Sequence, residues 1–501
     1  MNNYFQTISS SFAKVENQDT QYKIDYWLLI FSILLWRFPI SLGLRNDLLF
    51  RILFLFPFII QIIIKFIYLN INKPPFLIDK KFLVVFLLYV AIWVVGFIRT
   101  ISYYSTNSPS SNLDSFSLTA YLLTLIILCG FFFLLLACHT DNKKRKRLLQ
   151  AIFYTFELYI AINFILFIFG IKSIELTYLT NYPAQMLSAL GISLNRTMFS
   201  MAGGINSFGI LPGAIMVGLF PLLISRRDLF SRIFLILVIL IGMSVILLTD
   251  SRGSLIFSII TLVLMYIPPE LFKIFRWSPI LISFLPVFVL IVFPFLLDPR
   301  IDLFIRPRSE GNERNTSAMI TTECKDYLKQ TRGFLSNRPF IWEMIIDDLH
   351  DFKITQIIGY GIRGQVVSGL SNSYSCLFSS FVRPTLASAH NSWLEIFLDY
   401  GYFGLVIILI FLITVIRKLS KFYEETKDEL YKGMLACILY ITLTGTLESS
   451  FSQDFYGIFI ILLFISISLL FKTSPGKIEP EDSNYPLGTS LQSKFSNLAR
   501  L

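Results

Sequence analysis

The sequence predicts an all-α, polytopic membrane protein with about twelve transmembrane helices and a large extracytoplasmic loop that forms a small helical cap. Three observations lead to this fold class. The 501 residues are 54% hydrophobic and only 15% charged, whereas soluble domains carry about 25% charged residues. Long apolar runs alternate with short basic segments. The polar interval 298–391 separates two groups of apolar runs and is too long for a simple turn.

Apolar runs of about 17–25 residues are long enough to cross the hydrocarbon core of a bilayer. No removable signal peptide is expected, because the polar start has no short apolar core followed by a cleavage site. The expected spans are 26–44, 48–69, 82–101, 117–138, 148–170, 205–224, 233–250, 254–268, 278–297, 397–416, 431–448 and 456–471. The chain then divides into a cytoplasmic segment at 1–25, transmembrane helices at 26–297, the cap loop at 298–391, transmembrane helices at 392–471, and a disordered cytoplasmic tail at 472–501.

The basic residues predict the orientation of these helices. With the N-terminus in the cytoplasm, nearly every short basic segment lies on the cytoplasmic side, as the positive-inside rule requires. The formal net charge of +10 is then a consequence of membrane topology, and no nucleic-acid partner is expected. The basic segments are 70–81, 141–147, 225–232, 268–277, 417–421 and the tail after 472.

The cap loop contains one clear helical pattern. Apolar residues recur at helical spacing from Trp342 to Leu349, which predicts an amphipathic helix at 338–350. Cys324 and Cys376 are the two cysteines of this loop. A disulfide between them requires an oxidising compartment. Neither their spacing nor the sequence around them fixes their approach, so a disulfide and two free thiols both stay open.

His390 is the first candidate for a catalytic residue. It precedes the pattern Ser-Trp-Leu-Glu at 392–395, which has the form of a capping box and opens the next span. His390 and Asn391 are therefore expected just outside a helix N-terminus. An imidazole titrates near neutrality, which suits a general base. The alternative interpretation is a polar residue at a membrane interface.

Three arginines are candidates for binding an anion. Arg252 lies in the polar break TDSRGS between two apolar runs, where a charge is costly and usually has a partner or ligand. Arg338 opens the amphipathic helix, and its planar fork suits a phosphate or diphosphate. Arg196 precedes the glycine-rich stretch MAGGINSFG. The alternatives are an ion pair with Asp250 for Arg252 and plain solvation for Arg338. No Cys/His metal spacing and no nucleotide-binding loop occur, so neither a metal nor another cofactor is expected.

Four patterns together resemble the O-antigen ligase and O-antigen polymerase superfamily of bacterial envelope glycosyltransferases. They are NRTMFSMAGGINSFG, LLTDSRGSLIFSII, NRPFIWEMI followed by IIGYGIRGQ, and SAHNSWLEIFLDYGYFG. They follow the family's order over roughly 196–404. Two positions depart from the family: Arg363 stands where a small residue is frequent, and Ser207 stands where a Pro-Asn pair is common.

The resemblance implies a bacterial inner (cytoplasmic) membrane enzyme whose active face is periplasmic. The donor would be a glycan linked to a polyprenyl diphosphate, and the acceptor a hydroxyl of a glycolipid or glycan. Arg252, Arg338 and Arg196 would bind the diphosphate, and His390 would activate the acceptor hydroxyl. The expected substrate contacts are Asn391, Trp342, Tyr360 and Arg363.

Several functions stay open at this point. A ligase that uses lipid A core oligosaccharide, a polymerase that uses another repeat unit, and a protein O-glycosylase share the same motifs. A multi-span transporter belongs to a different class, but transporters usually show internal repeats, and none is found here. A structural membrane protein would leave Arg252 and His390 without a role.

Overall fold

The computed structural model describes residues 80–106, 142–171, 183–200, 205–266, 338–350, 354–378 and 388–449, with a few positions between 27 and 67. Within these residues the regular elements are helices and no strand occurs. Five of the helices are long and apolar enough to cross a membrane. The all-α class and the membrane character are therefore confirmed. The number of about twelve spans and the division of the chain into five parts stay predictions.

Several expected features fall on residues that the structure does not describe. These are the spans at 117–138, 278–297 and 456–471, nearly all of 26–44, more than half of 48–69, Cys324 with the first part of the cap loop, and the tail.

Four of the expected spans match long helices closely. The run at 82–101 lies in α4 and the run at 148–170 in α6, whereas 205–224 and 233–250 correspond to α8 and α9. Their mean hydropathies are 1.9 to 2.7, and part of each apolar surface is exposed, as expected for helices that face lipid. The bounds are α4 Lys80–Thr106, α6 Asn142–Ile168, α8 Ile205–Ser225 and α9 Leu229–Thr249.

Two shorter apolar helices complete the described bundle: α10 (Arg252–Tyr266) and α18 (Glu429–Thr444). α18 packs tightly against α8, because a Cβ on Gly433 would overlap the carbonyl oxygen of Gly218. The expected run 431–448 was too long at its end. Helix α18 ends at Thr444, and the chain turns so that carbonyl groups of the following residues can accept hydrogen bonds from the start of α17.

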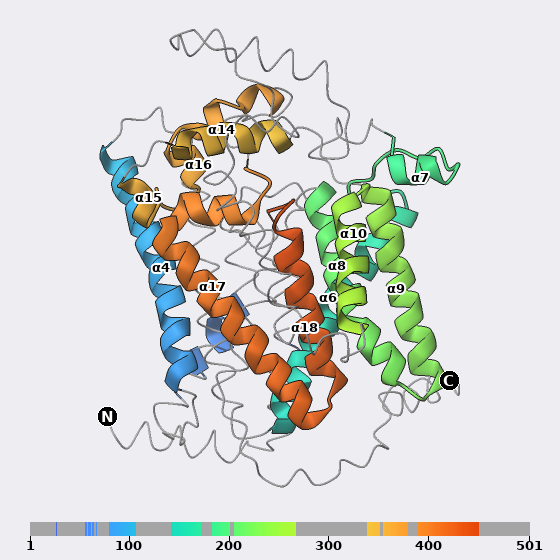
Figure 1. Cartoon of the computed structure of the whole chain (residues 1–501). Helices are drawn as coiled ribbons and strands as arrows, with labels where there is room; N and C mark the ends of the chain where they lie inside the picture. Colours follow the sequence, from blue (N-terminus) through green and yellow to red (C-terminus); the bar gives the residue numbers. More distant parts are fainter. Residues whose placement is uncertain are drawn as a thin grey trace.

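Helix α17 (Ser392–Thr426) consists of two parts joined at Gly401, whose φ of 67° and ψ of −167° lie outside the helical region. Figure 1 shows the first part lying across the ends of the bundle and the second part descending through it. A Cβ at Gly401 would overlap the backbone of α15, so glycine is required there. The helix that begins at Ser392 is therefore not a straight span, because it turns at Gly401.

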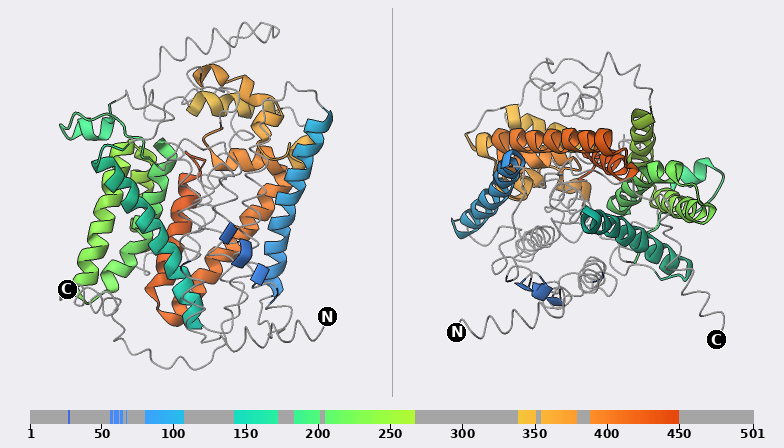
Figure 2. Two further views of the ribbon diagram at one scale, coloured as in Figure 1. Left: turned by 180° about the vertical axis from the view of Figure 1, so that it is seen from behind. Right: turned by 90° about the horizontal axis from the view of Figure 1, so that it is seen from below.

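The short helices of the polar interval lie together at one end of the bundle, beside α4 and the first part of α17 (Figures 1 and 2). The expected helix at 338–350 is confirmed as α14 (Arg338–His350). Its side chains Phe340, Ile341 and Ile345 pack with Tyr374 and Leu398 in a small core that is separate from the main one. The other elements are α15 (Thr355–Ile358), α16 (Gly364–Val367), and the 3₁₀ helices η2 (Leu370–Asn372) and η3 (Ser375–Phe378).

A turn with three positive φ angles fastens this group to the bundle. Gly359, Gly361 and Arg363 have φ values of 74°, 102° and 58°. The Tyr360 amide donates to the Leu398 carbonyl at 2.7 Å, and the Thr100 hydroxyl of α4 lies within hydrogen-bonding distance of the turn. Glycine at positions 359 and 361 thus allows the backbone of this turn to pack directly against the backbones of α17 and α4.

The helices alternate in direction, so that the described basic segments and the start of α14 lie at opposite ends. The α8–α9 and α17–α18 connections lie at the lower end in Figure 1, and α14 lies at the upper end. The segment with α7 (Gln185–Ala189) projects beside the end of α9 at the upper end. This arrangement agrees with the alternation expected from the positive-inside rule.

Candidate active site

A buried ion pair connects α14 to the turn after α18. The guanidinium of Arg338, the first residue of α14, contacts Oε1 of Glu448. The two side chains are only 15% and 7% exposed. Burial alone raises the pKa of Glu448, but Arg338 and then His390 outweigh it and hold the pKa below its ordinary value of 4.5. Glu448 is therefore a carboxylate at neutral pH.

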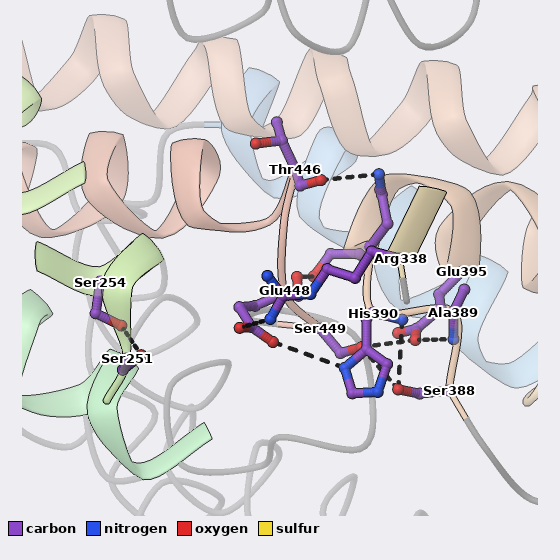
Figure 3. Close-up of polar contacts among 12 residues, drawn as sticks. Ser251, Ser254, Arg338, Ser388, Ala389, His390, Glu395, Thr446, Glu448 and Ser449 are labelled. Carbon is purple, nitrogen blue, oxygen red and sulfur yellow. Dashed lines mark hydrogen bonds and ion pairs between the residues drawn. The ribbon is translucent and has the colours of Figure 1, made fainter. Parts of the chain in front are cut away.

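His390 lies on the other side of the same carboxylate. Its Nδ1 is 3.7 Å from Oε2 of Glu448, and its side chain is 29% exposed (Figure 3). The backbone φ of 50° is unusual for a residue with a side chain. Neighbouring contacts hold it there: Ala389 donates its amide to Oε1 of Glu395 at 3.0 Å, and the His390 amide lies 3.4 Å from the Ser388 hydroxyl.

Asn391 fixes the start of α17. Its side-chain oxygen accepts from the amides of Trp393 and Leu394 at 3.0 and 3.1 Å, and its side-chain nitrogen donates to the Thr446 carbonyl at 3.0 Å. The residue is fully buried. Both ends of the Asn391 amide are therefore engaged within the protein. A direct contact between Asn391 and substrate stays a prediction.

The expected capping box was wrong in its register. Asn391 is the N-cap residue and Ser392 is the first helical residue. The Ser392 hydroxyl instead donates to the Glu448 carbonyl at 3.0 Å. Glu395 accepts from the Ser449 hydroxyl at 2.6 Å and from the Ala389 amide. The reason is tertiary: the turn after α18 supplies carbonyl groups that need donors from this helix start.

Arg196 and Arg252 both lie beside the end of α9. The guanidinium of Arg196 donates from Nε and Nη2 to the Thr249 carbonyl at 3.3 and 3.2 Å, at the end of α9. Asp250 has a left-handed backbone with φ of 53° and accepts the Met186 amide at 3.0 Å. Arg252 follows as the first residue of α10. The break TDSRGS is therefore a tight turn between two apolar helices.

The charges of these groups act on one another across the two halves of the bundle. Burial lowers the pKa of Arg196, Asp250 and Glu448 oppose that change, and Arg252 and Arg338 reinforce it. Arg196 thus lies within electrostatic range of Arg252 and Arg338 and of two carboxylates. The role of the three arginines in binding a diphosphate stays a prediction.

A sequence comparison finds a known family in one part of the chain. Residues 235–409 match the O-antigen ligase family. This match supports the assignment of the chain to the O-antigen ligase and polymerase superfamily. The matched range contains Arg252, Arg338 and His390, whereas Arg196 and Glu448 lie outside it. No curated protein matches the chain.

The remaining candidate residues support the site or the turn beside it. The Trp342 indole donates to the Ala389 carbonyl at 3.0 Å, which ties α14 to the residue before His390. Tyr360 and Arg363 belong to the turn that docks against α4 and α17. Among the described residues, no group of three or more His, Cys, Asp or Glu is placed to hold a metal ion.

Sequence reasoning missed Glu448. This residue is 5% exposed and contacts both Arg338 and His390. The signal was present, because Glu448 is a lone acid in the stretch YITLTGTLESS that follows an apolar helix. A charge near the membrane boundary is costly, and this cost marks Glu448 as much as Arg252.

Proposed function

We propose that the protein is a ligase that transfers a glycan from a polyprenyl diphosphate to a hydroxyl of lipid A core oligosaccharide. The observation that carries this proposal is the pairing of Arg338 and His390 with one buried carboxylate, Glu448, at one end of a membrane bundle. Arg196 and Arg252 are proposed to join this site. The family assignment supports glycan transfer over the transporter interpretation.

The arginines suit the leaving group of this reaction. A diphosphate gains negative charge as its bond to the sugar breaks, and fixed guanidinium groups stabilise that charge. The planar guanidinium groups of Arg196, Arg252 and Arg338 also suit the geometry of phosphate oxygens.

His390 is proposed as the base for the acceptor. The acceptor oxygen forms a bond to the anomeric carbon while the bond from that carbon to the diphosphate oxygen breaks. The hydroxyl proton passes to Nε2 of His390, and the bonding electrons leave with the polyprenyl diphosphate. Nε2 is the nitrogen for this step, because Nδ1 faces Glu448. Trp342, beside the His390 loop, is a proposed contact for the sugar, together with Tyr360 and Arg363.

The orientation follows from the same arrangement. The described basic segments lie at the end of the bundle opposite the proposed site, and basic segments stay in the cytoplasm. We therefore place the protein in the bacterial inner membrane with its active face toward the periplasm. The lipid tail of the donor would remain in the bilayer beside the helices.

Complementation of a ligase-null strain and of a polymerase-null strain tests this function. The wild-type chain is expected to restore glycan on the lipid A core, and His390→Ala and Arg338→Ala are expected to abolish it. Arg417→Ala is the matched control, because this exposed arginine lies on the second part of α17, toward the opposite end. Immunoblots verify equal amounts in the membrane.

Other outcomes point elsewhere. Restored chain elongation in the polymerase-null strain alone would replace the ligase assignment with the polymerase alternative. Full activity of His390→Ala and Arg338→Ala would refute the proposed site.

A further inference from the structure

Glu448 lies between the two groups on which the proposed reaction depends. One carboxylate oxygen contacts the Arg338 guanidinium, and the other lies 3.7 Å from Nδ1 of His390 (Figure 3). The charge of Glu448 also favours the protonated form of Arg196 and so counteracts burial, which lowers the pKa of that arginine. Arg338 and His390 come from the polar interval, whereas Glu448 follows α18, so this single acid connects separate parts of the chain.

The backbone of Glu448 is held in place. Its carbonyl oxygen accepts from the Ser392 amide at 3.3 Å and from the Ser392 hydroxyl at 3.0 Å. The next residue, Ser449, donates to Glu395 at 2.6 Å. These bonds tie the Glu448 turn to the start of α17, directly beside His390. A carboxylate mounted in this way is suited to hold its neighbours rather than to swing aside when a ligand arrives.

The geometry points to Glu448 as a positioning residue for glycan transfer: one oxygen holds Arg338 toward the diphosphate, and the other turns His390 so that Nε2 faces the acceptor hydroxyl. This inference rests on the proposed function. A carboxylate beside Nδ1 selects the tautomer that leaves Nε2 free to accept a proton, and it stabilises the imidazolium that forms. The separation of 3.7 Å exceeds a hydrogen bond, and such contacts often shorten when substrate binds.

A second interpretation makes the opposite kinetic prediction. Glu448 could occupy the anion site as an internal stand-in that the diphosphate must displace. Its removal would then strengthen donor binding and leave the chemical step intact. A positioning residue acts in the transition state, so its removal lowers kcat with little effect on the donor KM.

The test uses the full-length protein in proteoliposomes with a polyprenyl-diphosphate oligosaccharide and an acceptor glycolipid. Glu448→Gln keeps the size of the side chain and removes its charge. We expect kcat to fall about 100-fold, in the range of a general-base defect, and the donor KM to change less than about threefold. We also expect the acid limb of the kcat/KM profile to move toward lower pH, because the anion that favours the imidazolium is gone.

Other charged and titratable groups face Glu448 and stay in place in this variant. They are Arg338 from α14, Arg196 from the segment before α8, Tyr440 from α18 and His390 itself. Arg338 and Arg196 remain cationic throughout the pH range of the assay. A shift in the acid limb of the kcat/KM profile therefore reports the protonation of His390.

Glu395→Gln is the matched control. Glu395 is also buried, at 3% exposure, and accepts from Ala389 and Ser449 in the same turn. A loss of local structure would affect both variants alike, but only Glu448→Gln should shift the pH profile. Glu448→Asp keeps the charge one methylene further away, and we expect a folded protein with an intermediate kcat and the wild-type acid limb.

Three results would overturn the inference: an unchanged kcat with a lower donor KM in Glu448→Gln, the same pH profile in Glu448→Gln and Glu395→Gln, or full kcat in Glu448→Asp. The last remains informative if Glu448→Gln does not fold. Failure of the wild type to transfer glycan, or full activity of His390→Ala, would instead refute the proposed function.

Discussion

Replacement of Asn391 by alanine should destabilise the start of α17 and displace His390. The variant removes the acceptor for the Trp393 and Leu394 amides, and a lost N-cap costs about 1 kcal/mol. It also leaves the Thr446 carbonyl without the Asn391 donor, which costs about 1–3 kcal/mol when the group is buried. We therefore expect a total loss of about 2–4 kcal/mol in the free energy of unfolding.

Unfolding of the purified protein by SDS titration in detergent micelles, followed by circular dichroism, measures this loss. Asn391→Ser is the matched variant, because serine is a good N-cap residue but cannot donate as the amide nitrogen does. It should lose only the part due to Thr446, about 1–3 kcal/mol. The reasoning is refuted if Asn391→Ala stays within about 0.5 kcal/mol of wild type, the range of ordinary surface substitutions.

Three further predictions concern the core and the ion pair. Arg338→Ala should destabilise the protein by up to about 3–5 kcal/mol, because the buried Glu448 carboxylate loses its guanidinium partner and keeps only His390. The double variant Arg338→Ala, Glu448→Gln should recover part of that loss in the same titration, and no recovery would contradict the pairing. Gly433→Ala should lower the free energy of unfolding by about 1–3 kcal/mol, because the new methyl group forces α18 away from Gly218 of α8. Gly253→Ala is the matched control: its Cβ would meet only a leucine methyl at 3.8 Å, so it should be neutral or stabilising by up to about 1 kcal/mol. Equal losses in the two variants would refute the packing. The lowered pKa of Glu448 contributes stability that is complete above the unfolded-state pKa and is lost as pH falls through the lower pKa of the folded protein. Unfolding midpoints measured across acidic pH should show this loss in the wild type and a smaller loss in Glu448→Gln. Parallel curves for the two proteins would contradict the prediction.

Arg252 and Arg338 could be singled out from the sequence because charges within apolar surroundings are conspicuous. Arg252 stood out in a short polar break, and the alternation of basic segments placed it at the same end as Arg338. The helical period at 338–350 predicted α14 with its observed bounds. These inferences depend on local pattern and on the membrane, which restricts the arrangements that are available to a chain.

The contacts of Glu448 could not be predicted, because they join residues 58 and 110 positions apart in sequence. Local rules also gave the wrong N-cap. Asn391 and Ser392 are both good capping residues, and only the position of the turn after α18 decides between them. The bend at Gly401 likewise depends on close contact with the backbone of α15, which no periodicity reveals.

The central claim is that His390 and the arginine group transfer a glycan from a polyprenyl diphosphate. The most direct measurement follows a radiolabelled polyprenyl-diphosphate oligosaccharide in proteoliposomes that contain the purified protein and lipid A core acceptor. We predict that the wild type forms labelled glycolipid and releases polyprenyl diphosphate in equal amounts, and that His390→Ala forms neither. Labelled product at the wild-type rate from His390→Ala, or no transfer by the wild type, would contradict the account.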